Sequence, residues 1–382
     1  MPQRASEADI RRHAQQLYDT AAAAPSRLFD RQWWSGRLLE WAIKDEAFKV
    51  QLFRFIDVLP TLKSPEQIQR LVEEYFGEAS LPAAGGRSLM RWGMRALSAV
   101  GFGAGISADT IYNQTLQMAN QFIAGAGMPE ALPAVESLWK SGLAHSIDLL
   151  GEAVVSEREA DAYAARYRQA ITSLAAVAAG WQATPLLEAD HLGPLPRAQV
   201  SIKLSALYSQ FDPVDPEGCY VAIAGRLRPL VRLAAGLPVG ITFDMEQYSW
   251  KDLTIGIVKR LLLEDEFQAY PYASIALQAY LKDTERDVME FSAWAKKRHQ
   301  PFGIRLVKGA YWDYETIIHR QRGWPIPVFP EKDATDACYE RLIPLMLDEI
   351  EVIRPMWGTH NLRQVALGIA EAERRGLPRN SI

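Results

Sequence analysis

The stretch Ile304–Asp313, IRLVKGAYWD, decides the fold of this chain. A short run of β-branched residues and leucine, carrying one arginine, ends in a lysine, Gly309, two aromatic residues and an acid. This pattern is typical of a buried parallel strand with charge at its C-terminal end. Cations beside an apolar run are costly unless an anion meets them, and Gly309 would admit a flat ligand between Tyr311 and Trp312. The segment alone also fits an ordinary strand that ends in solvent.

Five further stretches share this design, and helical-looking segments separate most of them. They are Ile147–Val154, Val200–Leu207, Ile241–Tyr248, Ile275–Tyr280 and Met356–Asn361. Alternation of this kind predicts βα units and a parallel sheet. In a (β/α)8 barrel the active-site groups lie at the C-terminal strand ends. All six runs end in such groups, namely Glu152, Lys203, Ser205, Asp244, Glu246, Gln278, Tyr280, Lys308, Tyr311, Thr359, His360 and Asn361. We therefore predict an α/β fold, a distorted (β/α)8 TIM barrel of which about six strands are present.

Composition narrows the class of protein. The 382 residues are 48% hydrophobic and 23% charged, which is typical of a globular protein, and the net charge of -4 gives no reason to expect a nucleic-acid partner. Cys219 and Cys338 lack metal or redox spacing, so we expect two reduced thiols and no metal site. The polar N-terminus does not read as a secretory signal, and the uncharged stretch 96–108 is too short to span a bilayer. We expect a cytoplasmic or peripherally membrane-associated protein.

The chain divides into three regions. We predict a helical N-terminal arm (1–84), a helical connection (85–144) and an incomplete barrel (145–382). In the arm, Ser64 followed by proline indicates a helix start, and apolar residues recur with helical spacing. These residues are better explained by core packing than by cofactor contact: Trp33, Trp34, Leu38, Leu39, Ala42, Phe48, Leu52, Phe53 and Phe55. The stretch 80–87 reads as a loop, the helical pattern resumes over 88–144, and Ser156 caps the first barrel helix.

Several motifs resemble a known family. The segments SIKLSAL (201–207), FDME (243–246), LQAY (277–280), RLVKGAYWD (305–313) and THN (359–361), in that order, look like the proline dehydrogenase flavoenzymes. The arm segment 29–60 resembles the bacterial bifunctional proline utilisation A proteins, in which a proline dehydrogenase barrel precedes an aldehyde dehydrogenase domain. The resemblance covers nearly the whole chain; RLVKGAYW and the arm are its specific parts.

The resemblance implies an activity. It implies FAD-dependent oxidation of L-proline to 1-pyrroline-5-carboxylate, with hydride passing to flavin N5 and electrons to ubiquinone or another membrane quinone. This would be the first step of proline catabolism to glutamate, with peripheral membrane contact, and it is compatible with a homo-oligomer. Because no GxGxxG turn follows a strand, a Rossmann mode of binding is not expected, and the flavin would lie across the top of the barrel.

Flavin contacts follow from the motif positions. Arg305 would meet the ring edge near its reactive nitrogen, and Gln278 would meet the pyrimidine side. Each of three residues has a structural alternative. Arg305 could form an ion pair within the barrel, Gln278 could be satisfied by hydrogen bonds to the backbone, and Lys332 could lie on the solvated surface. A lone histidine such as His360 is more often structural. The cofactor-binding residues implied in full are Asp244, Gln278, Arg305, Val307, Gly309, Trp312, Lys332, Thr335, Thr359, His360 and Asn361.

Substrate contacts are expected on the same strand ends. Lys203 would bind the proline carboxylate, Tyr311 would pack on its ring, and Leu306 would form an apolar wall. Asp148 completes the substrate set, and the catalytic group would be Lys203, Asp244, Arg305 and Tyr311. A salt bridge from Lys203 to Asp148 or Asp244 is the structural alternative. We assign no general base.

One departure from the family pattern matters. The family closes its barrel with two more strands and a helix that carries paired arginines, whereas this chain stops at Ile382. We expect that the natural polypeptide continues. Two other functions stay open. One is a lyase of the aldolase type that forms a Schiff base on Lys203 or Lys308; the other is a non-catalytic module.

Overall fold

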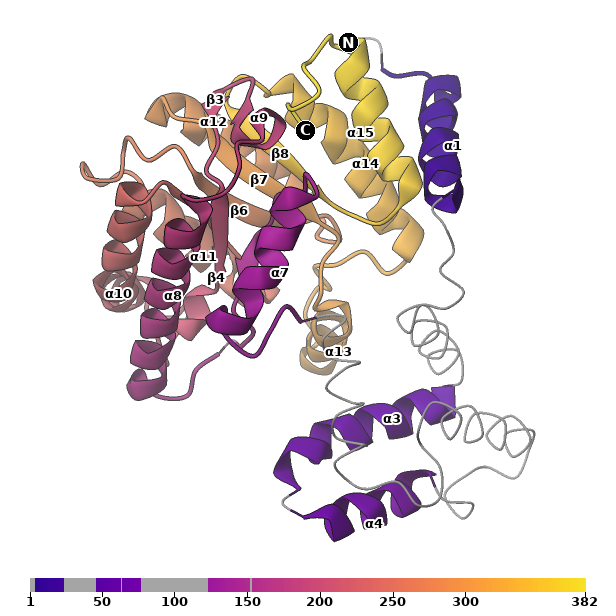
Figure 1. Cartoon of the computed structure of the whole chain (residues 1–382), viewed down its shortest axis with the longest axis vertical. Helices are drawn as coiled ribbons and strands as arrows, with labels where there is room; N and C mark the ends of the chain where they lie inside the picture. The colour runs from indigo at the N-terminus through magenta and orange to yellow at the C-terminus, as the bar shows by residue number, and fades with distance from the viewer. Residues whose placement is uncertain (1–3, 24–45, 63, 77–122, 152) are drawn as a thin grey trace. The chain divides into compact units, whose positions relative to one another are not determined.

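A computed structural model describes residues 4–23, 46–62, 64–76, 123–151 and 153–382 of the chain (Figure 1). The chain forms two units, Ala24–Ala131 and a larger one made of Met1–Ala23 with Leu132–Ile382. The expected aromatic stripe at Trp33 to Ala42, the loop at 80–87 and most of the helical pattern after residue 88 lie outside the described residues.

The larger unit is built on a parallel sheet of six strands. Their order is β1-β4-β5-β6-β7-β8, and every neighbouring pair is parallel. Each of the six sequence runs supplies one strand, so the predicted α/β fold class is confirmed. The hydrogen bonds do not close the sheet into a ring, since β1 and β8 each pair on one side only among the described residues. The strands are β1 (Ile147–Asp148), β4 (Ala198–Ile202), β5 (Val239–Phe243), β6 (Ala273–Gln278), β7 (Phe302–Val307) and β8 (Ile353–Gly358).

Helices follow the strands and pack around the sheet (Figure 1). Ser156 begins the first of them as predicted, because its side chain accepts a hydrogen bond from Glu159 N. Buried apolar side chains on these helices face the wholly buried strands β5 and β6 and form the core. The helices are α8 (Glu157–Ala178), α10 (Pro216–Gly236), α11 (Tyr248–Leu261), α12 (Thr284–Arg298), α13 (Trp312–Arg322), α14 (Lys332–Asp348) and α15 (Leu362–Arg374).

Strand register sets which side chains share the inner face of the sheet. Residues two apart on a strand point to the same side. One paired row crosses all six strands, made of Asp148, Ser201, Thr242, Ser274, Gly303 and Arg354. Two residues further along the strands lie Lys203, Asp244, Ala276, Arg305 and Met356, and this second row therefore faces the same side at the C-terminal strand ends.

The first helix, α1 (Glu7–Ala23), packs on α15 within the larger unit (Figure 1). Ala5 N donates to Glu371 Oε1 at 2.8 Å, and Arg363 Nη1 and Nη2 donate to Glu7 Oε1 and Oε2 at 2.7 and 3.0 Å. Most of α7 (Met128–Lys140) also belongs to this unit. The smaller elements that complete it are α9 (Pro185–Glu188), β2 (Ala189–Asp190), β3 (Gly193–Pro194) and the short 3-10 helix η3 (Leu204–Ala206).

The described part of the smaller unit is helical. It holds α3 (Glu46–Val58), the 3-10 turn η1 (Leu59–Thr61) and α4 (Pro65–Phe76). The helix start predicted at Ser64 is confirmed, since α4 begins at Pro65 and Gln67 N donates to Ser64 Oγ at 3.4 Å. Phe55, one of the arm aromatics, is buried with Leu59 and Ile68, so it serves the core of this unit.

Candidate active site

A chain of charged side chains crosses the C-terminal ends of four strands. Lys203 Nζ donates to Asp148 Oδ1 and Oδ2 at 2.9 and 3.0 Å and to Asp244 Oδ2 at 2.8 Å. Arg305 Nη2 donates to the other oxygen of Asp244, and Arg305 Nη1 donates to Ser201 Oγ at 3.1 Å. Two cations thus face two carboxylates, and the network carries no net charge. The structure brings together four of the site residues predicted from the sequence: Asp148, Lys203, Asp244 and Arg305.

Burial makes this network stronger than a surface ion pair. The side chains of Lys203 and Asp244 are 13% and 9% exposed. Burial by itself lowers the pKa of Lys203, but Asp244 and then Asp148 outweigh it, and the net pKa is raised. Lys203 is therefore a stable ammonium at neutral pH. The salt-bridge alternative for this lysine is what the structure contains, with both candidate carboxylates as partners.

Gln278, at the end of β6, presents an unused acceptor. Its Nε2 donates to Met245 O at 3.3 Å and Glu246 O at 3.1 Å, and two carbonyl partners require the nitrogen on that side. Its Oε1 is buried, as is Arg305 Nε, and neither has a hydrogen-bond partner among the described residues. Buried acceptors and donors without a hydrogen-bond partner are rare in proteins, so these two groups indicate a binding site for a polar ligand. The edge of a flavin ring, with its N–H and carbonyl groups, fits that pair.

Gly309, two residues after the end of β7, forms a close backbone contact that we call the Gly309 shelf. Gly309 has φ +127°, and a Cβ there would lie 2.5 Å from the ring of Tyr280. Only glycine permits this conformation and this close approach. Tyr311, half-buried, ends the loop, and Trp312 begins α13 with its Nε1 donating to Phe329 O at 2.8 Å. The indole plane is fixed by that bond while 38% of the residue stays exposed.

A second cluster joins the end of β8 to the start of α14. Asp336 accepts from Lys308 at 2.5 Å, from Lys332 at 2.6 Å and from Gln364 at 2.9 Å. Burial raises the pKa of Asp336, but these three hydrogen bonds outweigh it and lower the pKa to about 2. Thr359 Oγ1 donates to Gln364 Oε1 at 2.6 Å, which ties the THN segment to this cluster.

The THN segment is itself ordered by capping. Asn361 N donates to Thr359 Oγ1 at 3.1 Å, and Asn361 Oδ1 accepts from Arg363 N at 3.0 Å, so that Asn361 is the N-cap of α15. His360 between them is exposed. An exposed imidazole beside a helix N-terminus is free to meet a phosphate group.

Two of the predicted residues, Leu306 and Thr335, are buried. Leu306 sits between Arg305 and Val307 on β7 and is fully buried, so by strand alternation its side chain points away from the Arg305 face. Thr335 is buried in the first turn of α14. The sequence analysis missed Ser201 and Gln364, which form hydrogen bonds with other site residues. Ser201 carried one signal, because it lies on β4 two residues before Lys203, which follows the strand.

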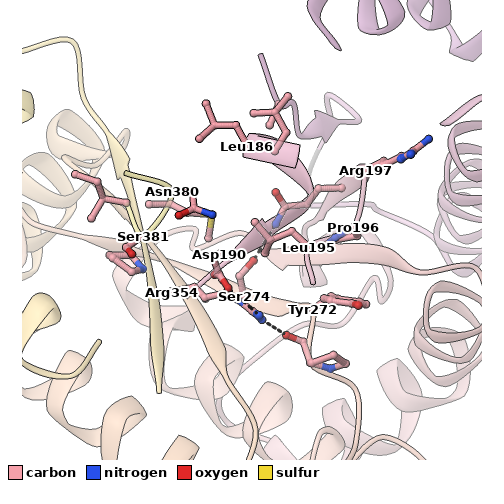
Figure 2. A pocket seen from close by; sticks show the side chains of 18 of the residues that line it. Leu186, Asp190, Leu195, Pro196, Arg197, Tyr272, Ser274, Arg354, Asn380 and Ser381 are labelled. Atoms are coloured by element: carbon pink, nitrogen blue, oxygen red, sulfur yellow. Dashed lines mark hydrogen bonds and ion pairs between the residues drawn. The ribbon is translucent and has the colours of Figure 1, made fainter. Parts of the chain in front are cut away.

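A cavity of about 580 Å³ lies at the opposite end of the sheet (Figure 2). Its lining includes Gln199, Ser274, Gly303 and Arg354, each the second residue of its strand. Arg354 is held there by Asp190 Oδ2 at 2.7 Å and donates to Pro271 O at 2.8 Å. This cavity opens at the N-terminal strand ends, and none of the predicted site residues lines it.

Comparison with known families gives two matches, which together span most of the chain. The family model for proline dehydrogenase matches residues 131–382. The chain belongs to the proline dehydrogenase family. The model for the proline utilization A N-terminal domain matches residues 7–122, so the resemblance inferred from the motifs is confirmed for both parts.

Individual relatives carry the same names. The chain is 30% identical over 250 residues to the bifunctional protein PutA of Klebsiella aerogenes, covering 65% of this chain and 18% of that protein. It is 28% identical over 229 residues to proline dehydrogenase 1 of Bacillus subtilis, covering 60% of this chain and 61% of that protein. The crystal structure of proline utilization A from Bdellovibrio bacteriovorus, inactivated by N-propargylglycine, superposes with a TM-score of 0.85 at 37% identity over 98% of this chain. The present chain spans 36% of that structure's length.

The described residues contain no group of three or more His, Cys, Asp and Glu side chains that could hold a metal ion. Nor do the helices in the same residues include one long and apolar enough to cross a bilayer.

Proposed function

We propose that this chain is the proline dehydrogenase part of a PutA-type bifunctional protein, and that it oxidises L-proline to 1-pyrroline-5-carboxylate with FAD. One observation carries the proposal. The network of Lys203, Asp244 and Arg305 lies on the same strand ends as the unpaired Gln278 Oε1 and the Gly309 shelf. In a chain of the proline dehydrogenase family, this combination provides a place for a flavin ring and an adjacent place for a small anion.

The residues fit FAD in two parts. Gln278 Oε1 and Arg305 would form hydrogen bonds with the edge of the flavin ring. The Gly309 shelf and Trp312 would pack next to the ring. The cluster of Lys308, Lys332, Thr359, His360 and Asn361 would hold the dinucleotide end, where two lysines and the N-terminus of α15 suit phosphate oxygens. When bound, the flavin supplies the acceptor for hydride from the ring carbon next to the proline nitrogen.

The remaining groups bind and orient the substrate. Lys203 would contact the proline carboxylate, with Tyr311 packing on the pyrrolidine ring. Asp244 holds both Lys203 and Arg305 in place through its two oxygens. The guanidinium of Arg305 would stabilise negative charge that develops at the ring edge during the reaction. The proline nitrogen must be uncharged before hydride leaves, and no residue here is assigned as its base.

Electrons would pass on to a membrane quinone, which makes the reaction the first step of proline catabolism to glutamate. In this proposal the protein works in the cytoplasm and touches the membrane peripherally. It remains compatible with a homo-oligomer. The domain limits 1–84, 85–144 and 145–382 are part of the same proposal.

The Schiff-base lyase has less support. A lysine that attacks a carbonyl needs a depressed pKa, whereas the pKa of Lys203 is raised by its two carboxylates once burial is overcome. Lys308 is bound to Asp336 at 2.5 Å. A non-catalytic module is disfavoured because an ion network across four strand ends is costly to keep without a ligand.

The test is a visible absorption spectrum of the full-length protein. We expect flavin bands that bleach on anaerobic addition of L-proline and return when a soluble quinone is added. L-Alanine, which has the carboxylate but no ring nitrogen, is the control and should not bleach them. A colourless protein that does not take up added FAD would refute the proposal, and an imine trapped by borohydride would favour the lyase.

A further inference from the structure

A buried glutamate on α13 caps a different helix. Glu315 is 1% exposed, and its Oε1 accepts a hydrogen bond of 2.6 Å from the backbone N of Tyr248, the first residue of α11. The N-cap residue of α11, Gln247, makes no side-chain capping bond. Glu315 therefore satisfies one of the orphan amides at the N-terminus of α11, and its charge suits the positive end of that helix.

The two helices that Glu315 joins, α11 and α13, follow β5 and β7, the strands whose C-terminal parts carry Asp244 and Arg305. α11 starts four residues after Asp244, at the end of β5. α13 starts directly after Gly309 to Tyr311, the segment that follows β7, and Glu315 N itself donates to Tyr311 O at 2.9 Å. The Glu315 side chain therefore links the start of α11, which follows the β5 loop, to the first turn of α13, which follows the β7 loop.

The loop after β6, the strand between β5 and β7, is also held by hydrogen bonds from α11. Tyr248 OH donates to Asp283 Oδ2 at 3.2 Å, and Lys251 Nζ donates to the same oxygen at 2.9 Å. The ring of Tyr280 lies under Gly309, and burial and then the charge of Glu315 raise the pKa of the Tyr280 hydroxyl. Three consecutive strand-end loops therefore depend on contacts that meet near one buried carboxylate.

We propose that Glu315 is a positioning residue for the flavin and proline sites, holding the β5 loop with Asp244 and the β7 loop with Gly309 and Tyr311 at their working separation. The inference rests on the proposed function. Glu315 touches neither ligand in this arrangement. Its carboxylate acts through the Tyr248 amide, while its backbone N–H makes the ordinary helical bond to the Tyr311 carbonyl that joins α13 to the β7 loop.

Three variants of the full-length protein test this role. Glu315→Gln keeps a side-chain oxygen at the same reach, Glu315→Asp keeps the charge but withdraws it by one methylene, and Glu315→Ala removes both. The control is Asp215→Ala, because Asp215 Oδ1 caps α10 by accepting from Gly218 N at 2.9 Å and belongs to the loop after β4 rather than to the loops after β5, β6 and β7. For each we would measure the FAD dissociation constant, KM for proline, kcat and the melting temperature.

We expect Glu315→Asp and Glu315→Ala to weaken FAD binding and to raise KM for proline about tenfold or more, which corresponds to about 1.4 kcal/mol. Glu315→Gln should keep both constants within about threefold of the parent, because its amide oxygen still accepts from Tyr248 N. Asp215→Ala should lower the melting temperature and leave both constants unchanged. If Glu315→Ala does not fold, the test is the difference between Glu315→Asp and Glu315→Gln in the FAD dissociation constant and in KM for proline.

Two results would overturn the inference. One is a Glu315→Asp protein whose FAD and proline constants match those of the parent. The other is a Glu315→Gln protein as impaired as Glu315→Asp, which would mean that reach to Tyr248 is not what matters. A parent protein that neither binds FAD nor is bleached by proline would refute the proposed function itself, and the two failures are thereby distinguished.

Discussion

The contact between Lys203 and Asp244 permits a quantitative prediction. At the 2.8 Å separation of Lys203 Nζ and Asp244 Oδ2, two unit charges attract by about 6 kcal/mol if the effective dielectric constant is about 20. Withdrawing both groups from water offsets much of this attraction. Lys203→Met leaves two carboxylates without their shared cation, and Asp244→Asn leaves Arg305 without its carboxylate. We expect each substitution to lower the free energy of unfolding by about 3 kcal/mol.

The assay is a double-mutant cycle by urea unfolding at neutral pH. The double variant should lose less than the sum of the two single losses, with a coupling energy of about 2 kcal/mol. The matched control is Arg232 with Glu266, an ion pair of 2.8 Å whose side chains are 59% and 39% exposed. Arg232→Met with Glu266→Gln should give a coupling below about 1 kcal/mol. Additivity of the Lys203 and Asp244 substitutions within about 0.5 kcal/mol would refute the view that this network is desolvated.

Three further outcomes are expected. Arg305→Met should lower kcat about a hundredfold and make the flavin reduction potential more negative, measured by steady-state kinetics and dye titration; if neither changes, Arg305 is not at the ring edge. Gly309→Ala should cost about 2 kcal/mol or more of stability, because its Cβ would meet the Tyr280 ring at 2.5 Å; an unchanged melting temperature would contradict this. Asp336 has a pKa of about 2 against an ordinary value of 3.8, so it stabilises the fold above pH 3.8 and loses that effect as the pH falls towards 2. Asp336→Asn should flatten the pH dependence of unfolding in that window, and a curve parallel to the parent's would speak against it.

The sequence was most informative where chemistry and periodicity coincide. Each strand of the six-stranded sheet was predicted from an apolar run with polar residues after it, and β7 within Ile304–Asp313 is the clearest case. β1 is the weakest, since only Ile147–Asp148 is paired in the sheet. The hairpin of β2 and β3 escaped prediction because each strand is two residues long and carries no period.

Long-range partners were harder to infer. The cost of burying Lys203 and Arg305 predicted an anion, but not that Asp148 and Asp244 would both supply it. The docking of α1 on α15 depends on pairs such as Ala5 with Glu371, which are 366 residues apart and leave no local pattern. Such contacts follow from the tertiary fold rather than from propensity.

Glu315 illustrates the same limit at the candidate site. In the sequence it is one acidic residue in the first turn of a helix, where acids are common because of the helix dipole. Its partner, the Tyr248 amide, lies 67 residues away and belongs to another helix. Only the packing of α13 beside the start of α11 turns a common local preference into a link between two loops.

The two interpretations of Lys203, ligand binding and structural salt bridge, concern different contacts of the same ammonium. Asp244 is 9% exposed and also holds Arg305, so its bond to Lys203 is costly to exchange. Asp148 is 41% exposed and within this network contacts only Lys203, so solvent already competes for it. A substrate carboxylate can therefore replace Asp148 while Asp244 keeps the lysine in position. An ammonium with one fixed and one exchangeable carboxylate is both a structural link between β4 and β5 and a binding group for an anion.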